Sequence, residues 1–212
     1  MSASTRAEAR SARKRQEILT AARSVFTAHG YVGTSMDAVA AAAGASKRTV
    51  YQYFADKEQL FAGVVLDTVD RGYEHFKPMI LALAEVDDLE TALRDHARMT
   101  LAGLMNPEIL QMRRLVVAEA ERFPAIGREY FERSWDRTLK LLAQTFAKLT
   151  ERGLLNTPDP ERAAYMFTWL IVSIPTNRAA FLGDASVGSP EELTALADEG
   201  TRIFLAAFAA GS

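Results

Sequence analysis

The sequence predicts an all-α fold: a small N-terminal three-helix domain followed by a larger C-terminal helical bundle, with about nine helices in total. Apolar residues recur at three- and four-residue steps along most of the chain, and no segment alternates as a strand would. Charge is also uneven: residues 1–53 carry eight Lys and Arg against three acids, whereas residues 54–212 carry 17 basic and 24 acidic residues. The N-terminal part therefore suits a polyanion and the remainder does not.

Composition excludes several classes of protein. The 212 residues include no cysteine, and the three histidines (His29, His75 and His96) are not at metal-ligand spacing, so we expect neither a metal nor a cofactor. No apolar run approaches the roughly 20 residues of a membrane-spanning helix, and the Ala- and Arg-rich start lacks the apolar stretch of a secretory signal. We therefore expect a cytoplasmic protein with no membrane partner.

The N-terminal domain is predicted over residues 13–72. Residues 1–12 are small, polar and basic, which predicts a flexible arm. A first helix begins near Arg13 and stops at Gly30, and Thr34 or Ser35 caps a second helix that ends before Gly44. Ser46 caps a third helix, 47–54, and a fourth runs from 57 to 77, where Pro78 follows.

Residues 73–212 are predicted to form the larger bundle. Its boundaries are marked by Asp, Asn, Gly and Pro clusters, which leave helices near 88–104, 107–121, 125–151, 159–181 and 190–209. The sequence contains no internal repeat.

The segment 35–54 has the pattern of a helix-turn-helix: a small-sided second helix, a Gly turn and a capped third helix. The alanine run 40–43 permits close helix packing, although alanine is also simply a good helix former. With Val50 and Phe54 pointing inward, Lys47, Arg48 and Tyr51 share the outer face of the third helix. These three side chains are suited to read base edges in a major groove.

Other polar residues around this motif are suited to bind phosphate: Ser35, Ser46, Thr49, Tyr53 and Lys57. For Tyr53 the alternative is that it packs under the fourth helix. Arg6, Arg10 and Arg13 of the arm can enter an adjacent minor groove, as homeodomain arms do, or simply act as a solubilising tail.

The predicted N-terminal domain also resembles a known family. The residues that carry the resemblance are Ile18, Leu19, Ala21, Ala22, Phe26, Gly30, Tyr31, Thr34 and Ser35, then the run from Ala43 to Glu58 (AGASKRTVYQYFADKE) and Leu60. This pattern, within about residues 13–65, is similar to the DNA-binding domain of the tetracycline-repressor (TetR) family. The resemblance implies a helical homodimer that binds operator DNA and a small effector. It also implies that Lys47, Arg48 and Tyr51 face bases, and that Gln52 joins Ser35, Thr49, Tyr53 and Lys57 at phosphates. Arg48 replaces a residue that is often small in the family, which leaves its target open.

The larger bundle resembles the family less specifically. The run Arg114 to Pro124 (RLVVAEAERFP) looks like the regulatory domain of the AefR-like branch. The resemblance implies an effector pocket among the helices that carry Met99, Met112, Val116, Trp135, Met166, Phe167 and Leu170. The alternative for each of these side chains is ordinary core packing.

Wide apolar surfaces on helices 159–181 and 190–209 predict a homodimer through a four-helix interface. The predicted contacts are Phe167, Leu170, Ile171, Ile174, Leu196, Ile203, Phe204 and Phe208. A two-fold pair of third helices about 34 Å apart would read a palindromic operator. Two other classes are an enzyme and a nucleoid-type protein that binds any DNA sequence. For an enzyme the sequence has no nucleophile elbow, phosphate loop or dinucleotide turn.

Overall fold

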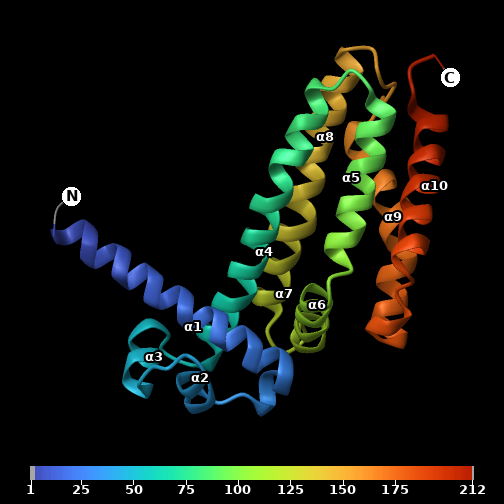
Figure 1. Ribbon diagram of the computed structural model, residues 1–212. Coiled ribbons are helices and arrows are strands. Elements are labelled where there is room, and N and C mark those ends of the chain that lie inside the picture. Colours follow the sequence, from blue (N-terminus) through green and yellow to red (C-terminus); the bar gives the residue numbers. More distant parts are fainter. Residues whose placement is uncertain (1–2, 212) are drawn as a thin grey trace. The chain divides into compact units, whose positions relative to one another are not determined.

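The structure, a computed structural model, describes residues 3–211, with side chains from Arg6 onward (Figure 1). These residues contain no β-strand and form ten α-helices: α1 (Ala3–Gly33), α2 (Met36–Ala42), α3 (Lys47–Tyr53), α4 (Lys57–Ala82), α5 (Leu89–Leu104), α6 (Pro107–Glu119), α7 (Pro124–Phe131), α8 (Arg137–Glu151), α9 (Pro160–Leu182) and α10 (Pro190–Phe208). A π-helical turn, Glu132–Asp136, joins α7 to α8 without a break, and together they match the single helix predicted over 125–151. The all-α prediction of about nine helices is confirmed.

The chain forms two compact units, which we call the head and the body. The head consists of residues up to 69 together with 115–130, and the body consists of 70–114 and 131–212. The chain thus passes between the units inside α4, inside α6 and at the end of α7. This division differs from the boundary expected near residue 72, because a segment distant in sequence packs on the head.

The head is organised around one face of α1. Ile18, Leu19, Ala22 and Phe26 of α1 are buried with Val39, Val50, Phe54, Leu60, Phe61 and Val64. The two predicted caps are present: the Ser35 hydroxyl accepts from the amide of Ala38, and the Ser46 hydroxyl accepts from the amide of Thr49, both at 3.1 Å. Each cap satisfies one orphan amide of a seven-residue helix.

The prediction of a flexible arm over residues 1–12 is wrong for the part of the arm that the structure describes. Residues 3–12 are helical and belong to α1, while the first two residues of the predicted arm lie outside the described part. Ala, Arg and Glu are strong helix formers, and extending an existing helix avoids the cost of nucleation. Gly30, the predicted stop, leaves the helical conformation with φ 68°, and one further turn follows to Gly33.

The fourth helix also runs further than expected. α4 continues through Pro78 to Ala82, although the chain was predicted to leave the helix after Lys77. Pro78 removes one backbone hydrogen bond, but continuing the helix buries Ile80, and Leu83 just beyond it. Tertiary burial therefore overrides the local stop signal.

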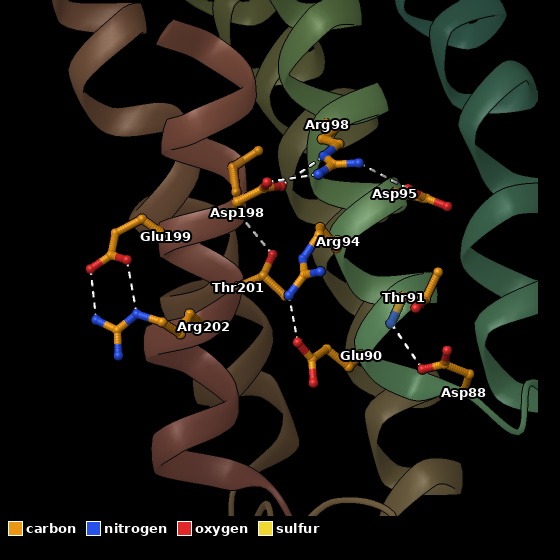
Figure 2. A network of polar contacts seen from close by, with 11 residues as sticks. Asp88, Glu90, Thr91, Arg94, Asp95, Arg98, Asp198, Glu199, Thr201 and Arg202 are labelled. Carbon is orange, nitrogen blue, oxygen red and sulfur yellow. Dashed lines mark hydrogen bonds and ion pairs between the residues drawn. The ribbon is translucent and has the colours of Figure 1, made fainter. Parts of the chain in front are cut away.

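The body is built on four long helices that contact one another: α5, α8, α9 and α10 (Figure 1). Its centre is aromatic, because the ring of Phe204 lies 5.1 Å from that of Phe146 and 4.9 Å from that of Phe167. At the surface, Arg98 of α5 donates two 2.7 Å hydrogen bonds to Asp198 of α10, as Figure 2 shows. The aromatic contacts thus join α10 to α8 and α9, and the Arg98–Asp198 pair joins it to α5.

His96 is buried inside this core. Its ring stacks on Phe167 at 6.2 Å, its Nε2 lies 3.4 Å from the Thr100 hydroxyl, and its Nδ1 has no partner among the described residues. Burial lowers the pKa of His96 to about 4. The side chain is therefore neutral near pH 7 in the folded protein.

We predict an acid sensitivity that depends on His96. Because its folded pKa lies below its ordinary value of 6.5, the unfolded chain takes up the proton first, so stability is complete above about pH 6.5 and is lost toward pH 4. Urea unfolding of wild type and His96→Gln should differ in the pH dependence of the free energy by about 2 to 3 kcal/mol between pH 7.5 and 4.5. The same change at the exposed His75 is the control. Identical pH dependence in wild type and His96→Gln would contradict the prediction.

Candidate nucleic-acid interface

The turn between α2 and α3 fixes the two helices at a close spacing. Gly44 adopts φ 53°, a conformation that other residues take only with strain, and its amide and that of Ala45 bond back to Ala41 and Ala40. Within the alanine run, Ala40 is buried while Ala41 and Ala42 are exposed. The run thus serves close packing on one side only.

α3 presents its polar face outward. Val50 and, just past the end of the helix, Phe54 are buried, whereas Lys47, Arg48 and Tyr51 are exposed. Tyr51 keeps 44% of its surface accessible, which is high for an aromatic residue on a seven-residue helix. The structure therefore brings the three predicted base-reading residues together on one accessible face.

The two cations of this face have different surroundings. The ammonium of Lys47 lies 2.9 Å from the carboxylate of Asp37 on α2, and the hydrogen bond to Asp37 raises the pKa of Lys47. Arg48 has no hydrogen bond or ion pair within residues 3–211. Asp37 therefore offsets part of the charge of Lys47, whose side chain is still 59% exposed, whereas the guanidinium of Arg48 has no such neighbour among the described residues. Sequence reasoning missed Asp37, because a partner ten residues away on another helix gives no periodic signal.

The predicted phosphate ligands fall into different environments. Ser35 and Ser46 cap α2 and α3 beside the exposed face, with the Thr49 hydroxyl 2.7 Å from that of Ser46, and Gln52 is exposed. The hydroxyl of Tyr53 lies 3.3 Å from that of Ser11, so this side chain reaches α1 rather than only packing under α4.

Lys57 has partners within the chain that the sequence did not indicate. Its half-buried ammonium donates to the carbonyl oxygens of Tyr31 and Thr34, both at 2.9 Å, and lies 4.5 Å from the centre of the Tyr31 ring. These carbonyls belong to the turn after α1, where the end of a helix leaves acceptors without partners. The ammonium is therefore held by these carbonyls in the free chain, and its contact with phosphate stays a prediction.

The three arginines predicted to enter a minor groove lie on α1 and have no hydrogen bond or ion pair with α3 among the described residues. Arg6, Arg10 and Arg13 are exposed and spaced to form one stripe of α1, with the Arg13 side chain 3.2 Å from Glu17. At 3.6 residues per turn, this stripe lies about 80° or more around α1 from the buried Ile18 and Ala22.

The residues predicted to line an effector pocket do not share one environment. Met99, Met166 and Leu170 are exposed, Met112 and Phe167 are buried in the body, and Val116 is buried in the head. Phe167 belongs to the aromatic core, and contact of these side chains with an effector stays a prediction. Trp135 is half-buried and stacks on Trp169 at 5.3 Å, while the indole N–H of Trp169 is buried without a partner in the described part of the chain.

The predicted dimer contacts divide in the same way. Phe167, Ile171 and Phe204 are at most 1% exposed in the single chain, so they are core residues and cannot contact a second copy. Leu196 and Phe208 are half-buried, whereas Leu170, Ile174 and Ile203 are exposed. The structure adds three exposed apolar residues on α9 that were not predicted: Met166, Phe181 and Leu182. Met166, Leu170, Ile174 and Phe181 recur at helical spacing, a signal present in the sequence.

Residues 3–211 give no indication of a membrane-spanning helix or of a metal site. Within residues 3–211 no helix is both long and apolar enough to cross a bilayer. No cluster of three His, Asp or Glu side chains in the same range is arranged to hold a metal ion.

Comparison with known proteins adds a family context. Residues 18–64 match the family model of bacterial regulatory proteins of the tetR family, and residues 91–210 match that of the AefR-like transcriptional repressor C-terminal domain. The HTH-type transcriptional regulator YfiR of Bacillus subtilis is 32% identical over 151 residues, 66% of each chain. The repressor AcnR of Corynebacterium efficiens is 39% identical over 57 residues, 27% of this chain and 30% of AcnR. The chain thus matches about two thirds of YfiR and under a third of AcnR.

Solved structures match over nearly the whole chain. A protein from Mesorhizobium loti, described as a TetR-family transcriptional regulator, is 42% identical with a TM-score of 0.91, covering 94% of this chain and 98% of its own. The flavonoid-responsive regulator FrrA is 28% identical with a TM-score of 0.71, covering 95% and 100%.

We predict that Lys57→Met destabilises the head. Removing the ammonium leaves the carbonyls of Tyr31 and Thr34 without their donor, at a cost of about 1 to 2 kcal/mol in the free energy of unfolding. Urea unfolding should reveal the loss, with the exposed Lys148→Met as the matched control. Equal stability of the two variants would refute the role assigned to Lys57.

Proposed function

Because this chain belongs to the TetR family of bacterial transcription regulators, we propose that it binds a palindromic operator as a homodimer and is released by a small-molecule effector. Repression is the direction of control that we assign to it. The family consists of transcription regulators, which are typically not enzymes, and we assign no catalytic activity to this chain. We propose the cytoplasm as its location, because operator DNA lies there.

The observation that carries this proposal is the exposed face of α3. Arg48 has no partner within the described residues, and its guanidinium can donate two hydrogen bonds to the N7 and O6 acceptors of guanine. Tyr51 next to it offers a ring edge to a thymine methyl and a hydroxyl to a base or phosphate. Ser35, Ser46, Thr49 and Gln52 lie around this face, where contacts to phosphate would set the register of α3 on the duplex.

The surroundings of Lys47 favour a reader of sequence over a nucleoid-type protein. Its pairing with Asp37 reduces the positive charge that the face offers to any duplex. A protein that binds all sequences alike depends on its phosphate-neutralising cations, whereas this face combines one available arginine with an exposed tyrosine.

For the effector we propose a planar organic molecule bound in the body. Trp135 and Trp169 present stacked rings, and the buried indole N–H of Trp169 lacks an acceptor that a ligand could supply. The name of FrrA, a flavonoid-responsive regulator, supports the same class of ligand.

For dimerisation we propose the exposed stripe of α9 and Ile203 of α10. The stripe (Met166, Leu170, Ile174 and Phe181) is apolar except at Asn177, and these four side chains stay exposed among the described residues. Burying such a surface against its two-fold copy is favourable by about 25 cal/mol for each Å² of apolar area.

Selection of binding sites from random duplex DNA with the purified chain tests the proposal. We expect a palindrome with half-sites one helical turn apart, bound about 10³-fold or more tightly than random DNA at the same salt concentration. Recovery of no preferred sequence would favour the nucleoid-type alternative.

We predict that Arg48→Ala and Tyr51→Ala each cost about 1 to 3 kcal/mol on the selected operator and relax the preference at one base pair. Fluorescence anisotropy with operator variants measures both effects. Lys148→Ala, which removes an exposed cation of α8 in the body, is the control and should bind as wild type does. Equal losses on operator and random DNA would exclude base reading by the residue concerned.

We predict that Ile174→Glu separates the dimer, because two buried carboxylates would face each other across a two-fold interface. Sedimentation velocity should give a monomer, while Leu81→Glu, at a similarly exposed apolar site on α4, should stay dimeric. A dimeric Ile174→Glu variant would show that the interface lies elsewhere.

A further inference from the structure

The head contains a corner that comes from the middle of the chain. α6 ends at Glu119 and α7 begins at Pro124, and the carbonyl of Glu119 accepts from the amides of Arg122 and Phe123 at 3.0 and 2.8 Å. The carbonyl of Phe123 in turn accepts from the amide of Ile126 at 3.0 Å. Both backbone groups of Phe123 are thus held, so its side chain has a defined direction.

Phe123 contacts the aromatic cluster of the head. Its ring meets that of Tyr31 edge-on at 4.8 Å and that of Phe61 at 6.2 Å. The guanidinium of Arg122 lies 5.0 Å from the Tyr31 ring and 5.1 Å from the Phe123 ring. Tyr31 is only 5% exposed, and this desolvation raises the pKa of its hydroxyl. The corner therefore covers one side of Tyr31.

Tyr31 lies in the last turn of α1, after Gly30 and three residues before Thr34, where the chain turns toward α2. Lys57 approaches its ring and holds the carbonyls of Tyr31 and Thr34, and the Thr34 hydroxyl donates to the carbonyl of Gly30 at 2.8 Å. The next residue, Ser35, is the N-cap of α2. A continuous series of contacts thus runs from Phe123 through Tyr31 and Lys57 to the first residue of the helix-turn-helix.

We propose that Phe123 is a positioning residue for operator binding, which acts by holding the turn between α1 and α2 in place. It fixes the Tyr31 ring, the ring and Lys57 fix the two carbonyls, and the carbonyls set where α2 begins. The inference rests on the proposed function, since it needs an operator to position against. DNA is bound by α3, whereas Phe123 belongs to a segment more than sixty residues further along the chain.

The effect should be separable from loss of folding. Phe123 is half-buried, so truncating it leaves a gap that solvent can fill rather than a closed cavity in the core. The main core of the head, around Phe26 and Leu60, stays intact. Non-specific binding should also persist, because it depends on charge more than on the angle of α3.

The test uses the full-length chain and the duplex recovered by selection. Phe123→Ala should weaken operator binding about tenfold and should bind random DNA as wild type does. Stoichiometric titration first determines the active fraction of each protein. Phe123→Tyr should restore operator affinity to within about twofold, since the edge-on ring contact is kept. Phe131→Ala is the matched control: the same substitution at a 57% exposed residue, expected to leave the dissociation constant unchanged.

A double-variant measurement tests the contact series itself. If Phe123 acts through Tyr31 and Lys57, the effects of Phe123→Ala and Lys57→Met should not add. The double variant should then lose little more operator affinity than the single variant with the larger loss. Additive losses, an unchanged dissociation constant, or equal losses on operator and random DNA would each overturn the inference.

If wild type itself selects no sequence, the proposed function fails first. If Phe123→Ala does not fold, Phe123→Leu is measured in its place with the same expected outcomes.

Discussion

The desolvation of one ring, that of Tyr31, organises the DNA-binding head. Phe26 stacks on it at 6.1 Å, Phe61 and Phe123 meet it edge-on, and the cations of Lys57 and Arg122 lie near its faces. Cations near a desolvated aromatic face are favourable by about 0.5 to 2 kcal/mol each. Because these groups come from α1, α4 and the α6–α7 corner, the ring joins three parts of the chain at the residue that leads into α2.

The recognition surface follows from how little of α3 the core requires. Only Val50, and Phe54 immediately after the helix, are buried, so the other side chains of this seven-residue helix are accessible to the DNA that we propose it binds. Its charges are not equivalent, since Asp37 neutralises Lys47 while Arg48 has no such partner among the described residues. Such a face discriminates through geometry and hydrogen-bond direction more than through total charge.

In the body, the aromatic core limits which apolar residues of α9 and α10 can contact a second copy of the chain. Phe146, Phe167 and Phe204 contact one another inside a single chain, so the strongest apolar groups of α9 and α10 are already buried there. What remains on α9 is a narrower stripe through Leu170 and Ile174. The core and the proposed dimer interface therefore lie on different faces of α9.

The sequence by itself determined the helical class, the caps at Ser35 and Ser46, the turn at Gly44 and the outward face of α3. Each of these depends on contacts within a few residues, which local periodicity and capping chemistry report. Tertiary structure alone decided that Lys57 serves the α1–α2 turn, that Asp37 pairs with Lys47, that Phe167 is core rather than interface, and that residues 115–130 belong to the head. These outcomes depend on which distant groups meet, and helical periodicity gives the direction of a side chain without identifying its partner.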